Sequence, residues 1–221
     1  MKIDIITLFP KMFSGPFDES IIARAQKNGL VDIKIHDLRQ WGLGERKTVD
    51  DRPYGGGVGM IIRVDVVDRA ISNLEFKILN ESQRRIILLT PRGEMYNQAK
   101  AREFSKLEHL ILICGHYEGF DQRIADHLVD EEVSIGNYVL TGGEIPAMVI
   151  ADSVARLVPG VVPKPEATLY ESFSLTTNNQ SLITNIEHPQ YTRPENFQGW
   201  EVPKVLLSGN HKEIEKWRTH N

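Results

Sequence analysis

Three glycine-containing segments carry residue types that can hold a small ligand closely. They are residues 90–93, 115–119 and 135–143, and each lies where a predicted strand ends. Glycine has no Cβ, so backbone amides and carbonyls can approach a ligand closely at these places. Ligands of open α/β sheets bind beyond the carboxyl ends of the strands, so the three segments predict one shared pocket. Ordinary turns are the alternative explanation for any one of them.

A fourth segment, residues 48–60, reads TVDDRPYGGGVGM. Asp50, Asp51 and Arg52 stand beside Tyr54 and three consecutive glycines. Ordering such a flexible loop costs conformational entropy, so it is an expensive way to make a simple turn. We interpret it as a loop that closes an aromatic face and paired charges over a flat polar ligand. The sequence contains neither a dinucleotide-binding fingerprint nor a phosphate loop, which leaves both of those ligand classes unsupported.

The elements that must position these segments alternate between strands and helices. Short apolar runs predict strands, and 3.6-residue periodicity predicts helices between them. The predicted strands are residues 1–8, 31–36, 85–90 and 109–114, with the third ending at Pro91. The predicted helices are residues 21–27, 64–73, 98–106 and 146 to about 158. This alternation indicates the α/β class, with a parallel sheet covered by helices on both faces.

The composition changes at Pro159. Residues 159–189 are rich in proline and polar side chains, which predicts a long connector. Asn210 followed by Glu213 predicts a capping box that opens a last helix containing Trp217. The final ~30 residues are too few to bury a core alone, so they must pack on the larger domain or on a partner subunit.

Composition and charge exclude several classes of protein. The chain has 221 residues, of which 41% are hydrophobic, enough for a sizeable core. The 26 Lys and Arg against 30 Asp and Glu give a net charge of −4, which argues against non-specific wrapping of nucleic acid but leaves room for a local basic patch. Cys114 is the only cysteine, so we expect no internal disulfide and no zinc site. No apolar run approaches the ~18 residues of a membrane span, and Asp4 interrupts the apolar start, so we expect a cytoplasmic protein without a signal peptide.

Five motifs in a fixed order carry a family resemblance. They are TVDDRPYGGGVGM at 48–60, CGHYEG at 114–119, SIGNYVLTGGE at 134–144, PQYTRP at 189–194 and VLLSGNH at 205–211. Together they resemble the bacterial tRNA (guanine-37-N1)-methyltransferases of the SPOUT superfamily. The resemblance implies an α/β methyltransferase domain with a deep trefoil knot at residues 1–160. It also implies a connector at 161–187 and a small, shortened helical tRNA-binding domain at 188–221.

The resemblance also implies a reaction and its partners. A methyl group would pass from S-adenosylmethionine to N1 of the guanosine at tRNA position 37, just 3′ of the anticodon. The enzyme would be a homodimer whose active site is shared between the subunits, with tRNA as its macromolecular partner. Mg²⁺ dependence is a further expectation from the resemblance, and no cluster of metal-ligand residues in the sequence locates a site.

Site residues carry over from the family motifs one by one. The base would be Glu171, Arg156 would stabilise charge on the target guanine, and Glu118 would contact the guanine edge. N1–H of guanine is a weak acid, so a base must take its proton, and a guanidinium near O6 stabilises the charge that develops there. The implied methyl-donor residues are Pro91, Gly115, Ile135, Gly136, Asn137, Tyr138, Val139 and Leu140. Further substrate contacts are expected from Asp50, Tyr54 and Ser172.

This sequence departs from the family pattern in four places. Glu171 stands where the family has an aspartate, and its extra methylene moves the carboxylate by about an ångström, a misplacement that can cost ~10²-fold in rate. His116 stands where arginine is common and Asn137 where aspartate is common, and we expect both to be tolerated because these loops work largely through their backbone. The chain also ends soon after Trp217, where relatives continue, so we expect fewer tRNA contacts.

Two other functions stay open at this point. A SPOUT enzyme that methylates a ribose 2′-hydroxyl typically relies on arginine or serine, and it would need neither the 48–60 loop nor a connector carboxylate. A non-catalytic RNA- or nucleotide-binding protein is made more plausible by the change at Glu171. Primer extension on treated tRNA discriminates the two methylation chemistries, because N1 methylation blocks base pairing and stops reverse transcription.

Overall fold

A computed structural model describes residues 1–74, 81–168, 171–173 and 186–220, and it divides into two compact units, Met1–Pro165 and Glu166–Asn221. The first unit is built on a five-stranded parallel sheet in the order β2-β1-β6-β5-β7. Its strands are β1 (Lys2–Thr7), β2 (Asp32–Asp37), β5 (Arg84–Met95), β6 (His109–Cys114) and β7 (Glu131–Ser134). The predicted α/β class with a parallel sheet is confirmed.

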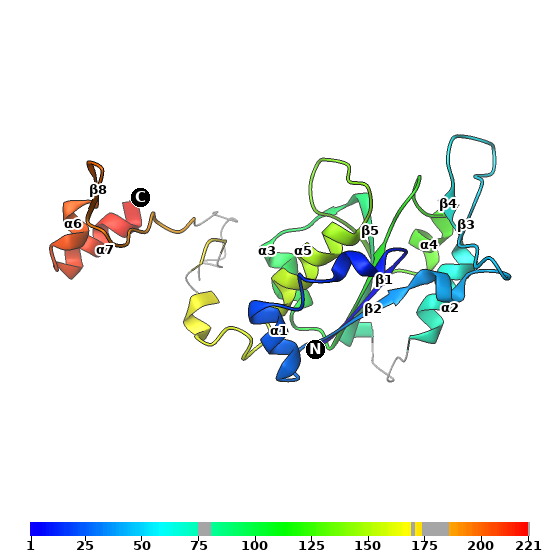
Figure 1. Ribbon diagram of the computed structural model, residues 1–221, viewed down its shortest axis with the longest axis horizontal. Coiled ribbons are helices and arrows are strands. Elements are labelled where there is room, and N and C mark those ends of the chain that lie inside the picture. Colours follow the sequence, from blue (N-terminus) through cyan, green and yellow to red (C-terminus); the bar gives the residue numbers. More distant parts are fainter. Residues whose placement is uncertain (75–80, 169–170, 174–185, 221) are drawn as a thin grey trace. The chain divides into compact units, whose positions relative to one another are not determined.

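Helices cover both faces of this sheet (Figure 1). One core packs α1 (Ser20–Lys27), α3 (Gln98–Phe104) and α5 (Glu144–Ala155) against it, and the other packs α2 (Val64–Asn73) and α4 (Gln122–His127). Alternation along β1 explains the two cores, because Ile3 and Ile5 belong to the first and Ile6 to the second. Strand β6 is buried along its whole length, as its continuous apolar run predicts.

Two predicted boundaries are wrong. Strand β5 does not end at Pro91 but runs to Met95, because both Leu89 and Glu94 pair with Val133 and the four residues between them bulge out. Gly93 makes this possible, since a Cβ there would lie 2.3 Å from the backbone nitrogen of Val133. Helix α5 begins at Glu144 and ends at Ala155 rather than spanning 146–158, because a proline is tolerated in the first turn of a helix.

Short elements complete the first unit. The antiparallel strands β3 (Asp50–Asp51) and β4 (Ile61–Ile62) form a hairpin that contains most of the glycine-rich segment 48–60. The 3₁₀ helices are η1 (Pro10–Phe13), η2 (Leu38–Trp41) and η3 (Glu81–Gln83), and η4 (Pro165–Thr168) spans the division between the units. Within the described residues, no helix is long and apolar enough to cross a membrane.

The described part of the second unit contains small elements. Strands β8 (Asn196–Phe197) and β9 (Trp200–Glu201) form a hairpin, followed by α6 (Lys204–Leu207) and α7 (His211–His220). The ring of Trp217 contacts those of His188 and Tyr191, with centroids 6.1 and 6.2 Å away. Half of the predicted capping box is present, since the backbone nitrogen of Glu213 donates to Asn210 Oδ1 at 3.5 Å. The backbone nitrogen of Asn210 donates to Ser208 Oγ at 3.1 Å rather than to the Glu213 side chain.

Candidate functional site

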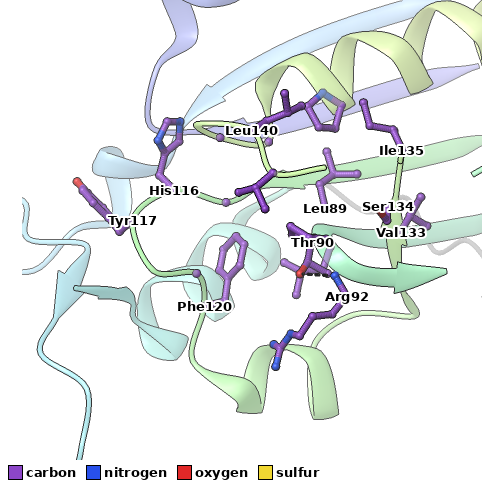
Figure 2. A pocket seen from close by; sticks show the side chains of 18 of the residues that line it. Leu89, Thr90, Arg92, His116, Tyr117, Phe120, Val133, Ser134, Ile135 and Leu140 are labelled. Atoms are coloured by element: carbon purple, nitrogen blue, oxygen red, sulfur yellow. Dashed lines mark hydrogen bonds between the residues drawn. The ribbon is translucent and has the colours of Figure 1, made fainter. Parts of the chain in front are cut away.

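A cavity of about 550 Å³ lies beyond the carboxyl ends of β6 and β7 and beside the bulge of β5. The structure brings together there the three glycine-containing segments singled out in the sequence (Figure 2). Its walls combine apolar side chains, such as Leu89 and Val133, with the hydroxyl-bearing Thr90 and Ser134. The lining also carries charged groups such as Arg92 and Glu118, so it suits a small molecule with both apolar and polar parts.

The first wall is the bulge of β5. Residues 90–93 leave the ladder between the two pairings with Val133, and the first three of them, Thr90, Pro91 and Arg92, line the cavity. The backbone nitrogen of Arg92 donates to Thr90 Oγ1 at 3.4 Å (Figure 2). The guanidinium of Arg92 donates to Gln122 Oε1 at 3.2 Å. Pro91, one of the expected donor-binding residues, lies on this wall.

The second wall is the loop after β6, residues 115–120. It turns sharply, because Tyr117 has a φ of 60° and Gly119 donates from its backbone nitrogen to the carbonyl of His116 at 3.1 Å. The ring of Phe120 forms part of the lining beside Thr90 and Arg92 (Figure 2). Gly115 and Glu118, both singled out in the sequence, lie on this wall.

The third wall is residues 134–143, between β7 and α5. Ser134 Oγ donates to the carbonyl of Gly136 at 3.1 Å, which closes a tight turn at the strand end. Of the expected donor-binding residues in this segment, Asn137 does not line the cavity, whereas its neighbours do. Those neighbours are Ile135, Gly136, Tyr138, Val139 and Leu140.

A buried carboxylate, Glu144, lies directly behind the second and third walls. Its side chain is fully buried, and it accepts a hydrogen bond at Oε1 from Thr7 Oγ1 at 2.6 Å. Its Oε2 lies 2.7 Å from His116 Nε2, on the cavity-lining loop. Burial raises the pKa of the neighbouring Cys114 thiol well above its ordinary value, and the charge of Glu144 raises it further, so this thiol stays protonated and inert.

The β3–β4 hairpin lies against the second wall. Glu118 donates from its backbone nitrogen to the carbonyl of Met60 at 3.1 Å, and Ile62 donates to the carbonyl of Gly119 at 2.9 Å. These bonds attach the glycine-rich hairpin to the edge of the main cavity. The 48–60 segment is therefore part of the same site region.

A second, smaller cavity of about 390 Å³ is lined by this hairpin and the start of α2. Arg63 makes ion pairs of 3.0 Å with both Asp51 and Asp65 there, and its hydrogen bond to Asp65 holds the pKa of that carboxyl below its ordinary value. Tyr54 lines the cavity with its side chain 99% exposed. Such an exposed ring is available to stack on a flat ligand.

The remaining predicted residues lie outside the main cavity. Asp50 pairs with Ile62 in the hairpin, and Arg156 caps the carboxyl end of α5. Glu171 and Ser172 belong to the second unit, where Ser172 Oγ accepts a hydrogen bond from the backbone nitrogen of Glu187 at 3.1 Å. Their roles stay predictions.

Sequence reasoning missed Thr7, Phe120 and the burial of Glu144. Thr7 lies 137 residues from Glu144 in the chain, and no local pattern connects them. The one available signal was the position of Glu144 after two glycines at a helix start, where a carboxylate is favoured by the helix dipole. In the described part of the chain, no group of three His, Cys, Asp or Glu side chains is placed to hold a metal ion.

Comparison with known proteins gives one consistent result. A family model described as tRNA (Guanine-1)-methyltransferase TrmD matches residues 1–221. The chain is 49% identical to the tRNA (guanine-N(1)-)-methyltransferase of Bacillus subtilis (strain 168), over 99% of this chain and 86% of the relative. It is 50% identical to those of Geobacillus kaustophilus and Carboxydothermus hydrogenoformans, over 99% of this chain and 85% and 81% of the relatives.

Proposed function

The chain belongs to the tRNA (guanine-1)-methyltransferase family and is a methyltransferase, and we propose that it methylates N1 of the guanosine at tRNA position 37 with S-adenosylmethionine as donor. The observation that carries this proposal is the cavity of about 550 Å³ at the carboxyl edge of the sheet. Its walls contain seven of the eight residues expected at the donor site, with Asn137 the exception. We expect the reaction to take place in the cytoplasm.

The cavity fits the proposed donor by size and chemistry. Its volume lies within the roughly 300–1,000 Å³ of typical small-molecule sites, and Leu88, Leu89 and Val133 offer apolar surface for a flat base. Thr90 and Ser134, together with the backbone groups of the three walls, offer polar contacts. When bound, S-adenosylmethionine supplies an electrophilic methyl group attached to a sulfonium.

The protein's own residues would prepare the guanine for attack. In our proposal Glu118, on the second wall, accepts hydrogen bonds from the guanine edge and selects it over adenine. Glu171 takes the N1 proton, and Arg156 stabilises the negative charge that develops at O6. Tyr54, Asp50 and Ser172 contact the surrounding nucleotides. No step is assigned to Mg²⁺, because among the described residues no group of three His, Cys, Asp or Glu side chains is placed to hold it.

We also propose that two copies of the chain form the working enzyme, with the active site shared between them. Helix α5 supports this, because it buries Ile150 and Val154 in the core yet exposes 46% of Ile145 and 42% of Val149. An apolar helix face at the surface suits a partner subunit. Sedimentation should therefore show a species of about twice the 25.1 kDa chain mass.

The domain assignment is part of the same proposal. Residues 1–160 would form the knotted donor-binding domain, 161–187 the connector, and 188–221 a small helical tRNA-binding domain. The aromatic contacts of Trp217 support an ordered tail. Basic residues would hold the tRNA phosphates, and the candidates are Arg46, Lys47, Arg193 and Lys212.

Methyl transfer to total tRNA tests the proposal directly. We expect 1-methylguanosine as the product and a primer-extension stop at position 37. In Glu171→Gln, donor binding should stay normal while turnover falls about 10²–10⁴-fold, since an amide cannot take the proton. Glu171→Asp is the matched control, because it keeps a carboxylate with a shorter reach. Near-full activity of Glu171→Gln would show that the base lies elsewhere, with Asp50 as the next candidate.

A further inference from the structure

Thr7, Glu144 and His116, which we name the Glu144 cluster, join three segments that are far apart in the sequence. Thr7 is the last residue of β1, Glu144 is the first residue of α5, and His116 lies in the loop after β6. The 2.6 Å bond from Thr7 and the 2.7 Å contact with His116 use both oxygens of one carboxylate. One side chain thus connects the second and third walls of the cavity to the centre of the sheet.

The cluster leaves little room for movement. Thr7 Oγ1 also accepts a hydrogen bond from the backbone nitrogen of Phe9 at 2.9 Å, and the Phe9 ring lies edge-on to the His116 ring with centroids 4.5 Å apart. A Cβ on Gly142 would lie 2.2 Å from His116 Nε2 and 2.5 Å from Glu144 Oε2. The third wall therefore passes directly over the contact between Glu144 and His116.

A fully buried carboxylate needs such partners. An ionised carboxyl group without hydrogen bonds or an opposite charge is strongly disfavoured inside a protein. Glu144 has the Thr7 hydroxyl, the His116 imidazole and the amino end of α5. Because these partners lie on separate segments, keeping the carboxylate satisfied requires all three segments to hold their positions.

We propose that Glu144 is a positioning residue for the methyl-donor site, acting through His116 and Thr7 to hold the second and third walls at a fixed separation. This inference rests on the proposed function of the cavity. Glu144 does not line the cavity, whereas its neighbours Gly142, Gly143 and His116 do. It therefore controls the shape of the binding site without contacting the reacting atoms.

The proposal predicts a particular split between binding and turnover. Loosening the walls weakens the hold on the donor in the ground state and the transition state alike, so the donor KM rises while kcat at saturating donor changes little. Removing one hydrogen bond to a charged group should weaken donor binding about 10-fold.

The test is calorimetric titration of the full chain with S-adenosylmethionine, with kinetics and thermal melting of each variant. Thr7→Val removes the hydroxyl at nearly constant shape, and Thr7→Ser restores it. Glu144→Gln is the more drastic variant, and Thr7→Val keeps the proposal testable if that one does not fold. Tyr96→Phe is the matched control, because it removes a part-buried hydroxyl that lies 2.7 Å from Ser153 Oγ and outside the cavity.

We expect weaker donor binding in Thr7→Val, recovery in Thr7→Ser, and unchanged binding in Tyr96→Phe. Equal donor affinity in Thr7→Val and wild type would overturn the positioning role, as would an equal loss in Thr7→Val and Thr7→Ser. Failure of the wild-type chain itself to bind S-adenosylmethionine would instead overturn the proposed donor site.

Discussion

Asp4 and Glu144 are both fully buried acids, yet their surroundings differ. Asp4 lies in the middle of β1, and its partners all come from strands: Lys2 at 2.9 Å, His36 at 2.7 Å and His109 at 2.6 Å. Glu144 lies beyond the strand ends, and its histidine partner comes from a loop that lines the cavity.

The different surroundings of Asp4 and Glu144 indicate that a buried, hydrogen-bonded carboxylate has a different role in each place. In both places a histidine and a second donor satisfy a buried carboxylate. Around Asp4 these bonds connect β1, β2 and β6, which are already held in register by their backbones. Around Glu144 they connect the end of β1 to the start of α5 and to the loop after β6, and no backbone ladder joins these three segments. We infer that the first carboxylate serves stability and the second serves binding.

The largest expected effect is that of Asp4→Asn on stability. The substitution removes the charge and replaces one of the two acceptor oxygens with an NH₂ donor, so His36, His109 and Lys2 are left with a single neutral acceptor. Breaking a buried pair in this way costs about 3 kcal/mol of unfolding free energy. Urea unfolding should show this loss, while the affinity for S-adenosylmethionine stays unchanged. If Asp4→Asn lost donor affinity but kept its stability, the assignment of Asp4 to stability and Glu144 to binding would be wrong.

Gly142→Ala should instead reduce catalytic efficiency much more than stability. Its new Cβ would push apart His116 and Glu144, and displacements of this size at a site cost roughly 10- to 100-fold in kcat/KM. The unfolding free energy should fall less than in Asp4→Asn, because the new Cβ displaces the contact between Glu144 and His116 without removing a hydrogen-bonding group. Steady-state kinetics with varied donor, beside urea unfolding, checks both expectations. A large loss of stability with unchanged kinetics would contradict them.

The pH dependence of stability should sharpen the Asp4 side of the comparison. Burial by itself raises the pKa of Asp4, but hydrogen bonds from His109, His36 and Lys2 outweigh it and hold the pKa well below its ordinary value. The folded state thus binds this proton less readily than the unfolded state. The stabilisation is therefore present above the unfolded pKa of about 3.9 and is lost as the pH falls through the folded value. Urea midpoints measured from pH 7 to pH 3 should fall less steeply in Asp4→Asn than in wild type.

The smallest effect is expected at the exposed rim of the site. Tyr54→Ala should leave the unfolding free energy within about 0.5 kcal/mol of wild type, because the side chain packs on nothing. Loss of a stacking ring should weaken tRNA binding about fivefold, which filter binding can measure. Tyr54→Phe keeps the ring and should bind normally, so equal losses in the two variants would exclude stacking.

The sheet and its helices were largely predictable from local pattern. The apolar run at His109–Cys114 and the periodicity of Val64–Asn73 predict β6 and α2 with their observed bounds. Strand β5 was predicted too short, because proline and glycine normally end a strand. After the bulge, Glu94 pairs again with Val133 of β7. This contact joins residues far apart in the chain, so a short stretch of sequence cannot predict it.

The site was predictable only in part. Glycines at strand ends indicated the three walls, and the family resemblance supplied the expected donor and catalytic residues. Glu144 could not be assigned from sequence, because a lone glutamate at a helix start is usually solvated. Its burial follows from contacts 28 and 137 residues away in the chain.

The position of β1 in the sheet has a consequence for the order of events during synthesis. This strand is made first, yet it lies between β2 and β6 and pairs with both, and β6 ends only at Cys114. On the ribosome, β1 and β2 can associate early, but the centre of the sheet stays open until more than half of the chain has emerged. Contacts this distant in sequence slow folding and leave an apolar strand edge uncovered in the meantime. We therefore expect the protein to be most prone to aggregation, and to depend most on a chaperone, while only its amino-terminal half has been synthesised.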